Sequence, residues 1–220
     1  MKHIYGAGAL LILISSVHAD PLRVAQVPLR ASVLNRFVPR GWRIEKRVDG
    51  DLDGNGSSDA ALVLVEDKPA KDTNGAATQR DRALVVVLRE KGDWKRVGIS
   101  NSLLLGTRDG GAFYSMMEAP VKVSIRDGVI LVKMEAGSRE VEETTHRLRF
   151  DSKRNGVFLI GFDSAVRDRL TGAVVGKSAN FLTGRQKTTT MGANDEKEKV
   201  KVSRVSRQLR RLETLGEKDR

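Results

Sequence analysis

The sequence predicts an all-β protein, and three observations carry that prediction. Short runs rich in Val, Ile and Leu recur along the 220-residue chain and are separated by Gly, Asn and Asp residues, the pattern of strands joined by turns. Helical patterns are confined to two short stretches, residues 31–37 and 203–215. A loop rich in Asp and Gly lies between two of the apolar runs. We therefore expect two antiparallel four-stranded meanders and a basic C-terminal tail or helix.

The first meander is expected on either side of the Asp/Gly-rich loop. The run at residues 83–88 is apolar throughout, which is typical of a central strand buried on both faces. Residues 66–81 are polar and contain Pro69 and an Asn-Gly pair, so they are expected to form a long exposed loop. The four strands are predicted at residues 42–48, 60–65, 83–88 and 94–99.

The second meander is expected beyond this block. Asp-Gly at residues 127–128 and Asn-Gly at residues 155–156 favour tight hairpin turns. Alternation places His146 and Leu148 on the inward, apolar face of their strand. The two meanders can face each other as a sandwich or stand side by side as in part of a propeller, and the sequence does not choose between these arrangements. The four strands are predicted at residues 121–125, 129–134, 145–150 and 157–162.

The Asp/Gly-rich loop is the strongest candidate for a functional site. Asp51, Asp53 and Asn55 alternate along it and a glycine follows at the sharp turn, the order in which a tight calcium loop presents its oxygen ligands. Ser57 is expected to offer its backbone carbonyl, and Asp59 to complete the ligand shell directly or through water. Three carboxylates held this close repel one another unless a cation lies among them. The alternative is a hairpin turn that binds no metal.

The loop departs from an EF-hand, because its twelfth position is Leu62 where an EF-hand carries Glu. It runs instead into a β-prone stretch, and residues 50–63, GDLDGNGSSDAALV, resemble the calcium loop of FG-GAP/VCBS repeats, the repeats of integrin-type β-propellers. The resemblance implies a calcium ion that staples the turn between two antiparallel strands. It is seen once, whereas a propeller needs roughly 4–8 blades. The ligands that it implies are Asp51, Asp53, Asn55, Ser57 (carbonyl) and Asp59.

A second, weaker resemblance lies toward the C-terminus. Residues 161–163 and 178–184 resemble the C-terminal part of uncharacterised exported bacterial proteins that carry one loop of this type. This resemblance implies no activity.

The two ends of the chain differ in composition from its middle. Residues 1–19 combine a basic start, an apolar run and a small-x-small ending, which indicates a secretory signal peptide, with a retained N-terminal anchor as the alternative. The β domain is expected at residues 20–184, where no apolar run is long enough to cross a membrane. Residues 185–220 are basic and are expected to be mobile or to form an amphipathic helix over residues 203–215, although the alternation at residues 199–202 also allows a strand to begin there.

The charge and the amino-acid content suggest a compartment and a class of partner. The chain has no cysteine and a formal net charge of +11 at pH 7. In a periplasmic or secreted protein without disulfides, a metal ion is an effective way to hold a turn. The basic excess predicts association with an anionic envelope surface or with another envelope protein rather than with nucleic acid, which an exported protein does not meet.

No combination of residues predicts catalysis. His146 is the only histidine after the expected signal peptide, and its place on an apolar face favours a core histidine over a triad member or a zinc ligand. Residues 172–178, GAVVGKS, are one residue too short between the glycines for a phosphate-binding loop. The acidic turn at residues 135–143 contains carboxylates that could serve hydrolysis, although a solvated turn explains it better.

We therefore expect a calcium-binding β protein with a structural or binding role. Two alternatives stay open: a cell-envelope hydrolase that uses loop carboxylates, and a module that binds polyanions or membrane surfaces through the basic tail.

Overall fold

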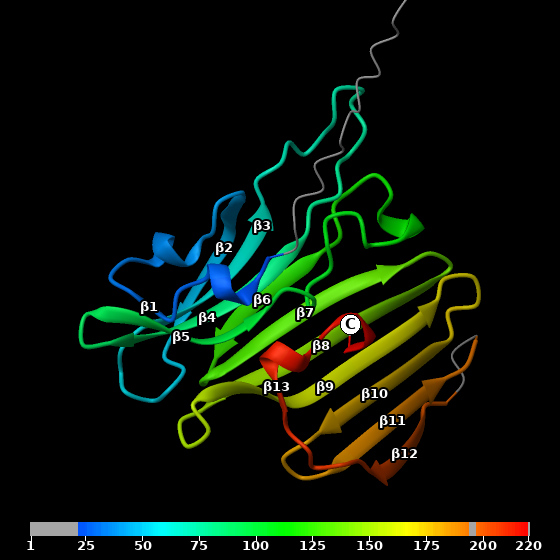
Figure 1. Ribbon diagram of the computed structural model, residues 1–220. Coiled ribbons are helices and arrows are strands. Elements are labelled where there is room, and N and C mark those ends of the chain that lie inside the picture. Colours follow the sequence, from blue (N-terminus) through cyan, green and yellow to red (C-terminus); the bar gives the residue numbers. More distant parts are fainter. Residues whose placement is uncertain (1–21, 194–196, 220) are drawn as a thin grey trace, which may run out of the picture.

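The computed structural model describes residues 22–193 and 197–219, and Figure 1 shows their strands arranged in two sheets. The expected signal peptide, residues 1–19, lies outside the described residues. Sheets of five and eight antiparallel strands confirm the predicted all-β class. No helix in the described part is long and apolar enough to span a bilayer. Its helices are the 3-10 helices η1 (Val24–Gln26), η2 (Leu34–Phe37), η3 (Ala112–Tyr114), η4 (Leu212–Thr214) and η5 (Glu217–Asp219).

The first sheet contains the first predicted meander and has the strand order β1-β5-β4-β3-β2. All four predicted strands are present and extend slightly beyond their predicted bounds, and a two-residue strand from the N-terminal segment pairs with the free side of β5. The polar stretch between β3 and β4 is a mostly exposed loop, as predicted. The strands are β1 (Arg30–Ala31), β2 (Trp42–Gly50), β3 (Asp59–Glu66), β4 (Arg82–Glu90) and β5 (Asp93–Ser100).

The first sheet is buried on both faces because it forms the middle of three layers. On one face, Leu62 and Val85 pack against the N-terminal segment, which includes the 3-10 helix η2 within the stretch predicted to be helical. On the other face, Val63 and Val86 face the second sheet. Every residue of β3 is buried. This double burial explains why β3 and β4 are apolar along most of their length instead of alternating.

The second sheet contains the second predicted meander and continues beyond it in the order β12-β11-β10-β9-β8-β7-β6, while β13 pairs with the early part of β9 that β10 leaves free. We call β10, β11 and β12 the wing, because they extend beyond the area covered by the first sheet (Figure 1). The strands are β6 (Val121–Arg126), β7 (Val129–Gly137), β8 (Glu140–Asp151), β9 (Gly156–Asp168), β10 (Val174–Asn180), β11 (Arg185–Met191), β12 (Lys199–Arg204) and β13 (Arg210–Arg211).

Among the described residues of the segment 185–220, the expected helix over residues 203–215 is absent, whereas the strand that the alternation at residues 199–202 allowed is present as β12. This segment forms β11, β12 and β13 with two short 3-10 helices, so the β domain extends beyond its predicted end. The β-branched residues 188–190 and the Lys/Val alternation at residues 199–202 suit strands once a partner strand is available. Val202 is exposed on β12, whereas Leu212 enters the core.

The two sheets face each other, so the sandwich is the arrangement present. One core contains side chains of β3, β4 and β5 on one side and of β7, β8 and β9 on the other, and Leu212 and Leu215 of the C-terminal segment complete it. The edge strands β2 and β6 approach closely, because a Cβ atom on Gly50 would lie 2.6 Å from Cγ2 of Ile125. Glycine at this position therefore allows the two sheets to meet beside the Asp/Gly-rich loop.

Arg82, at the start of β4, binds the segment between β5 and β6 that crosses from the first sheet to the second, which we call the crossover. Its side chain is 5% exposed, and Nη1 donates to the carbonyls of Leu105 (3.2 Å) and Ala119 (3.0 Å), near the two ends of the crossover. Nε and Nη2 donate to the Glu45 carboxylate at 2.7 and 2.8 Å, and Nη2 also donates to Glu118 at 3.2 Å. One guanidinium group therefore fixes the chain where it leaves the first sheet and where it enters the second.

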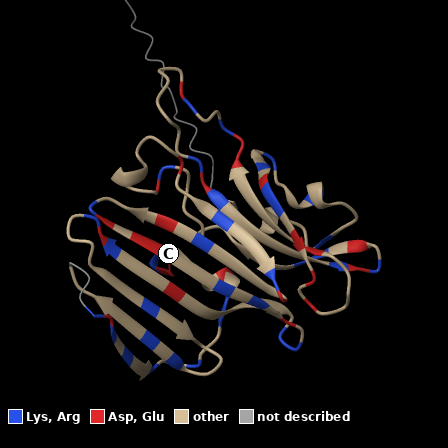
Figure 2. Ribbon diagram, turned by 180° about the vertical axis from the view of Figure 1, so that it is seen from behind, with Lys and Arg blue, Asp and Glu red and all other residues tan. Residues whose placement is uncertain are grey.

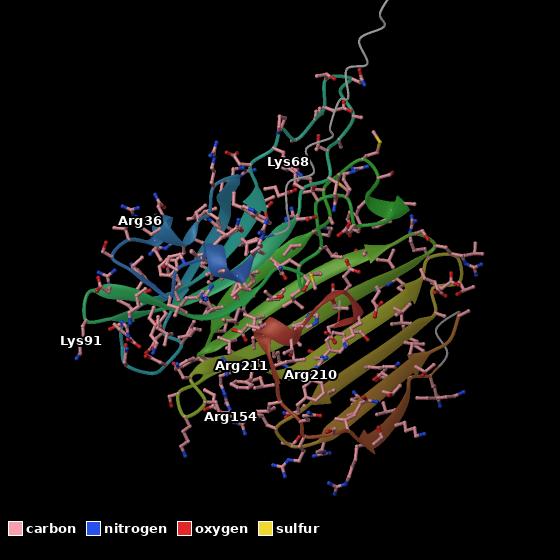
Figure 3. All side chains as sticks on the ribbon, in the orientation of Figure 1. Arg36, Lys68, Lys91, Arg154, Arg210 and Arg211 are labelled. Carbon is pink, nitrogen blue, oxygen red and sulfur yellow. The ribbon has the colours of Figure 1, made fainter. Side chains whose placement is uncertain are left out.

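The C-terminal segment is held on the second sheet by arginine side chains that Figure 3 labels. The guanidinium carbons of Arg154 and Arg211 each lie 5.4 Å from the centre of the Phe158 ring. Arg210 donates from Nη1 to the Asp219 carboxylate at 2.7 Å. These contacts bring η5 over β8, where it meets His146.

Candidate metal centre

The Asp/Gly-rich loop joins β2 to β3 and is folded by its own side chains. Asp51 accepts hydrogen bonds from the backbone N–H groups of Gly54 (2.7 Å) and Gly56 (2.8 Å), which curls the chain around one carboxylate. Both glycines have positive φ, 79° and 80°, a conformation that costs little only without a Cβ atom. Leu52 is 4% exposed and anchors the loop in the core between the sheets.

Three of the five predicted ligands converge in this loop. One carboxylate oxygen from each of Asp51, Asp53 and Asp59 lies within 4.8 Å of the other two. The other two predicted ligands lie in the same loop, where the side-chain oxygen of Asn55 accepts a hydrogen bond from Ser57 N (2.6 Å) and its amide donates to Asp53 (3.0 Å). The loop therefore concentrates carboxylate, amide and carbonyl oxygens at one end of the first sheet.

Asp59 differs from the other two carboxylates because it is fully buried. Its Oδ2 accepts a hydrogen bond from Leu52 N (2.8 Å) and its Oδ1 accepts one from Arg89 N (2.7 Å). Burial raises the pKa of Asp59, and the negative charges of Asp53 and Asp51 add to that rise. Through these two hydrogen bonds, Asp59 connects the loop to β4. The sequence did not predict this connection, because Arg89 is 30 residues away along the chain.

The negative charge of the cluster is balanced by backbone dipoles and by no basic side chain in the described part of the protein. Hydrogen bonds from the loop, with that of Gly56 foremost, lower the pKa of Asp51, so this carboxylate is ionised at neutral pH. No Lys or Arg nitrogen of the described residues lies within 4.0 Å of Asp51, Asp53 or Asp59. A bound cation would relieve the mutual repulsion of the three groups.

The donor set fits a hard divalent cation. All candidate ligand atoms are oxygens, which Ca²⁺ prefers, with each Ca–O distance about 2.3–2.6 Å. Two oxygens on opposite sides of such an ion are about 4.6–5.2 Å apart, so carboxylates within 4.8 Å of one another are close enough to share it. Mg²⁺ is a poorer fit, because its shorter bonds of about 2.0–2.1 Å and strict octahedron require a tighter cluster.

The other sites considered in the sequence are engaged in the structure of the fold. Glu135 accepts a hydrogen bond from the Tyr114 hydroxyl, and burial together with that bond raises the pKa of Tyr114 to about 12. Glu143 forms an ion pair with Lys133 at 2.5 Å. Residues 174–178 of the phosphate-loop candidate belong to β10, so that segment is a strand and not a loop around an anion.

His146 is fully buried, as the alternation predicted. Its Nε2 contacts the backbone carbonyl of Asp219 in η5, and its ring lies edge-on to Phe162 with 4.9 Å between the centres. Burial lowers the pKa of His146, and the hydrogen bond to Asp219 opposes this only in part. His146 is therefore a neutral core residue that joins the C-terminal segment to β8.

The lowered pKa of His146 predicts that stability falls as the pH drops below about 6.5. The unfolded chain binds a proton there and the folded chain does not, so acid favours unfolding until the folded-state pKa is passed, by at most about 1.4 kcal/mol per pH unit. We expect His146→Gln to remove most of the change in the urea midpoint between pH 7 and pH 5. Equal pH dependence in the variant and the parent protein would contradict this assignment.

Comparison with known proteins gave no relative from which a function could be transferred. No family model matches this chain, and no curated protein and no solved structure is significantly similar to it.

Proposed function

We propose that this protein is an exported calcium-binding β-sandwich with a structural or binding role, in which the ion holds the turn between β2 and β3. The observation that carries the proposal is the convergence of Asp51, Asp53 and Asp59, each of which places one carboxylate oxygen within 4.8 Å of one from each of the others. One of these groups is buried and has a raised pKa, so it is the group whose ionised form gains most from a cation.

The ion would act on more than the turn itself. The loop follows Gly50, the last residue of β2, which packs against Ile125 of the second sheet, and Leu52 of the loop belongs to the core between the sheets. An ordered loop therefore supports the edge where β2 meets β6. In a chain without cysteine, this is a place where a metal can do what a disulfide does in other exported proteins.

The FG-GAP/VCBS resemblance of residues 50–63 and the signal-peptide pattern of residues 1–19 support the rest of the proposal. The first favours calcium over other cations, with Asn55 and Ser57 completing the set of ligands. The second favours a periplasmic or secreted location, where calcium is abundant enough to fill a site that binds at ~10⁻⁴–10⁻³ M.

Calcium binding is tested by thermal and urea unfolding in chelator and in calcium. At about 10 mM calcium, the ion is expected to stabilise the protein by about 1.4–2.7 kcal/mol for that range of affinity. Asp53→Asn keeps the hydrogen-bond acceptor for Asn55 N but removes a charge, so it should abolish most of the calcium response.

The matched control for this test is Asp72→Asn. Asp72 lies in the exposed loop between β3 and β4 and, like Asp53, accepts backbone hydrogen bonds, from Asn74 N and Ala76 N at 2.9 Å each. This variant should respond to calcium as the parent protein does. Identical unfolding curves in chelator and in calcium would show that the loop is a turn without a metal.

A further inference from the structure

The outer face of the wing carries basic side chains that the calcium site does not use. Figure 2 shows bands of Lys and Arg across the outer strands of the second sheet. The paired residues of β10, β11 and β12 define which side chains share a face, because side chains alternate along each strand. On the face turned away from the first sheet, one row is Asn180, Arg185 and Arg204, and the next row is Ser178, Lys187 and Val202.

Arg185 and Arg204 lie directly opposite each other on neighbouring strands. Like charges in this position repel each other and destabilise the pair of strands. Both residues are exposed, and in the described part of the chain neither side chain has a hydrogen bond or an ion pair. The nearby Lys187 has a loose ion pair, 3.8 Å long and exposed to solvent, with Glu198. The three cations are therefore available to an external anion.

A hollow of about 360 Å³ is lined by Arg185 and Lys187, and its lining contains no carboxylate. Arg204 is not part of that lining but lies opposite Arg185 on the next strand. The side-chain oxygen of Asn180 accepts hydrogen bonds from Leu182 N (3.0 Å) and Thr183 N (3.1 Å), which leaves its amide N–H groups free to donate. Hydroxyl groups on Ser178 and Thr183 add further donors beside the arginines. The residues that line the hollow are Ser178, Asn180, Thr183, Arg185, Gln186, Lys187 and Val202.

We propose that this face of the wing binds a tetrahedral oxyanion, namely a phosphate group carried by a larger ligand. Arg185 and Arg204 supply planar forks that match two phosphate oxygens, and Lys187 adds a third positive charge. Asn180 and Ser178 hydrogen-bond the oxygens that remain. Binding relieves the repulsion between the two arginines, so the anion and the edge of the sheet stabilise each other.

The phosphate group can come from a soluble molecule or from the headgroup of a lipid, and two titrations separate these sources. The first measures binding of tripolyphosphate by calorimetry in calcium-free buffer at about 150 mM salt, where long-range attraction by net charge is largely screened. The second measures sedimentation with phosphatidylcholine vesicles that contain phosphatidylglycerol. Binding in either titration supports phosphate recognition and identifies its source.

Three double variants locate the binding. Arg185→Gln with Arg204→Gln should weaken it about tenfold or more, because hydrogen bonds to charged groups are the strong ones. Arg185→Lys with Arg204→Lys keeps the charge but loses the forks and should give an intermediate loss. Lys199→Gln with Lys201→Gln removes the same charge from the opposite face and should change the affinity less than about twofold.

This test of anion binding is independent of whether the Asp/Gly-rich loop binds calcium, because the buffer contains no calcium and the wing shares no residue with that loop. All substituted side chains are exposed, so the variants should keep the circular dichroism of the parent protein and melt no earlier than it does, and removal of the Arg185–Arg204 repulsion should if anything raise the melting temperature. The proposal would be overturned if Lys199→Gln with Lys201→Gln weakened binding as much as Arg185→Gln with Arg204→Gln. It would also be overturned if neither titration showed saturable binding.

Discussion

Replacing Arg82 by Ala is expected to lower the free energy of unfolding by about 3 kcal/mol. Removal of one partner from a fully buried ion pair costs about 3–5 kcal/mol, and the lower end applies because Glu45 and Glu118 are 26% and 43% exposed and can be rehydrated. Most of the loss comes from the carbonyls of Leu105 and Ala119, which would be left without their donor beside the core.

Urea unfolding followed by circular dichroism measures this effect. The matched control is Arg43→Ala on β2, whose exposed side chain forms a loose 3.8 Å ion pair with Asp67, and its effect should stay within about 0.5 kcal/mol. A loss below about 1 kcal/mol for Arg82→Ala would mean that the crossover is held by apolar packing and that the guanidinium contributes little.

Replacing Asp59 by Ala is expected to lower stability in chelator by about 2–4 kcal/mol, before any metal is considered. The change leaves Leu52 N and Arg89 N without their acceptor, and each unsatisfied buried group costs about 1–3 kcal/mol. Part of the loss is offset, because the variant no longer buries a charge beside Asp51 and Asp53.

Asp59→Asn separates the two roles of this residue. Its amide oxygen can still accept one of the two hydrogen bonds, so in chelator it should lose less stability than the Ala variant. Both variants should lose the response to calcium. Asp49→Ala serves as the control on the same hairpin, because its exposed ion pair with Arg47 contributes at most about 1 kcal/mol. If Asp59→Ala were as stable as the parent protein in chelator, the hydrogen bonds by which Asp59 connects the loop to β4 would not contribute to stability.

The strands that the sequence predicted are those in which local pattern and burial agree. β3 to β9 have apolar runs or alternating apolar residues, with hairpin turns such as residues 127–128 and 155–156 between several of them, and β2 has Trp42, Ile44 and Val48 beside the Asp/Gly-rich loop. β10 and β11 were missed because the wing is largely solvated on both faces, so its strands show no apolar face. Val202, Val205, Leu209 and Leu212 have helical spacing by coincidence, and pairing of β12 with β11 overrides it.

The sequence predicted those parts of the candidate metal centre whose residues are close in the chain, and it missed contacts that only the fold creates. Asp51 and Asp53 are close in the chain, so the sequence alone indicates their convergence. The repulsion between Arg185 and Arg204 was not visible, because these residues are brought together only by the register of two strands. The core position of His146 was predicted correctly, whereas its contact with Asp219 depends on a C-terminal segment that the sequence did not place.

The eight-stranded sheet ends at β12, and within the described residues no strand covers its far side. The main-chain donors and acceptors along that side could pair with a strand of a second molecule. Lys199 and Lys201 interrupt the apolar residues of β12, and their charges repel a second copy that approaches edge to edge. The protection of this edge against pairing with a second molecule is thus electrostatic. It weakens as the ionic strength rises or as polyanions cover Lys199 and Lys201.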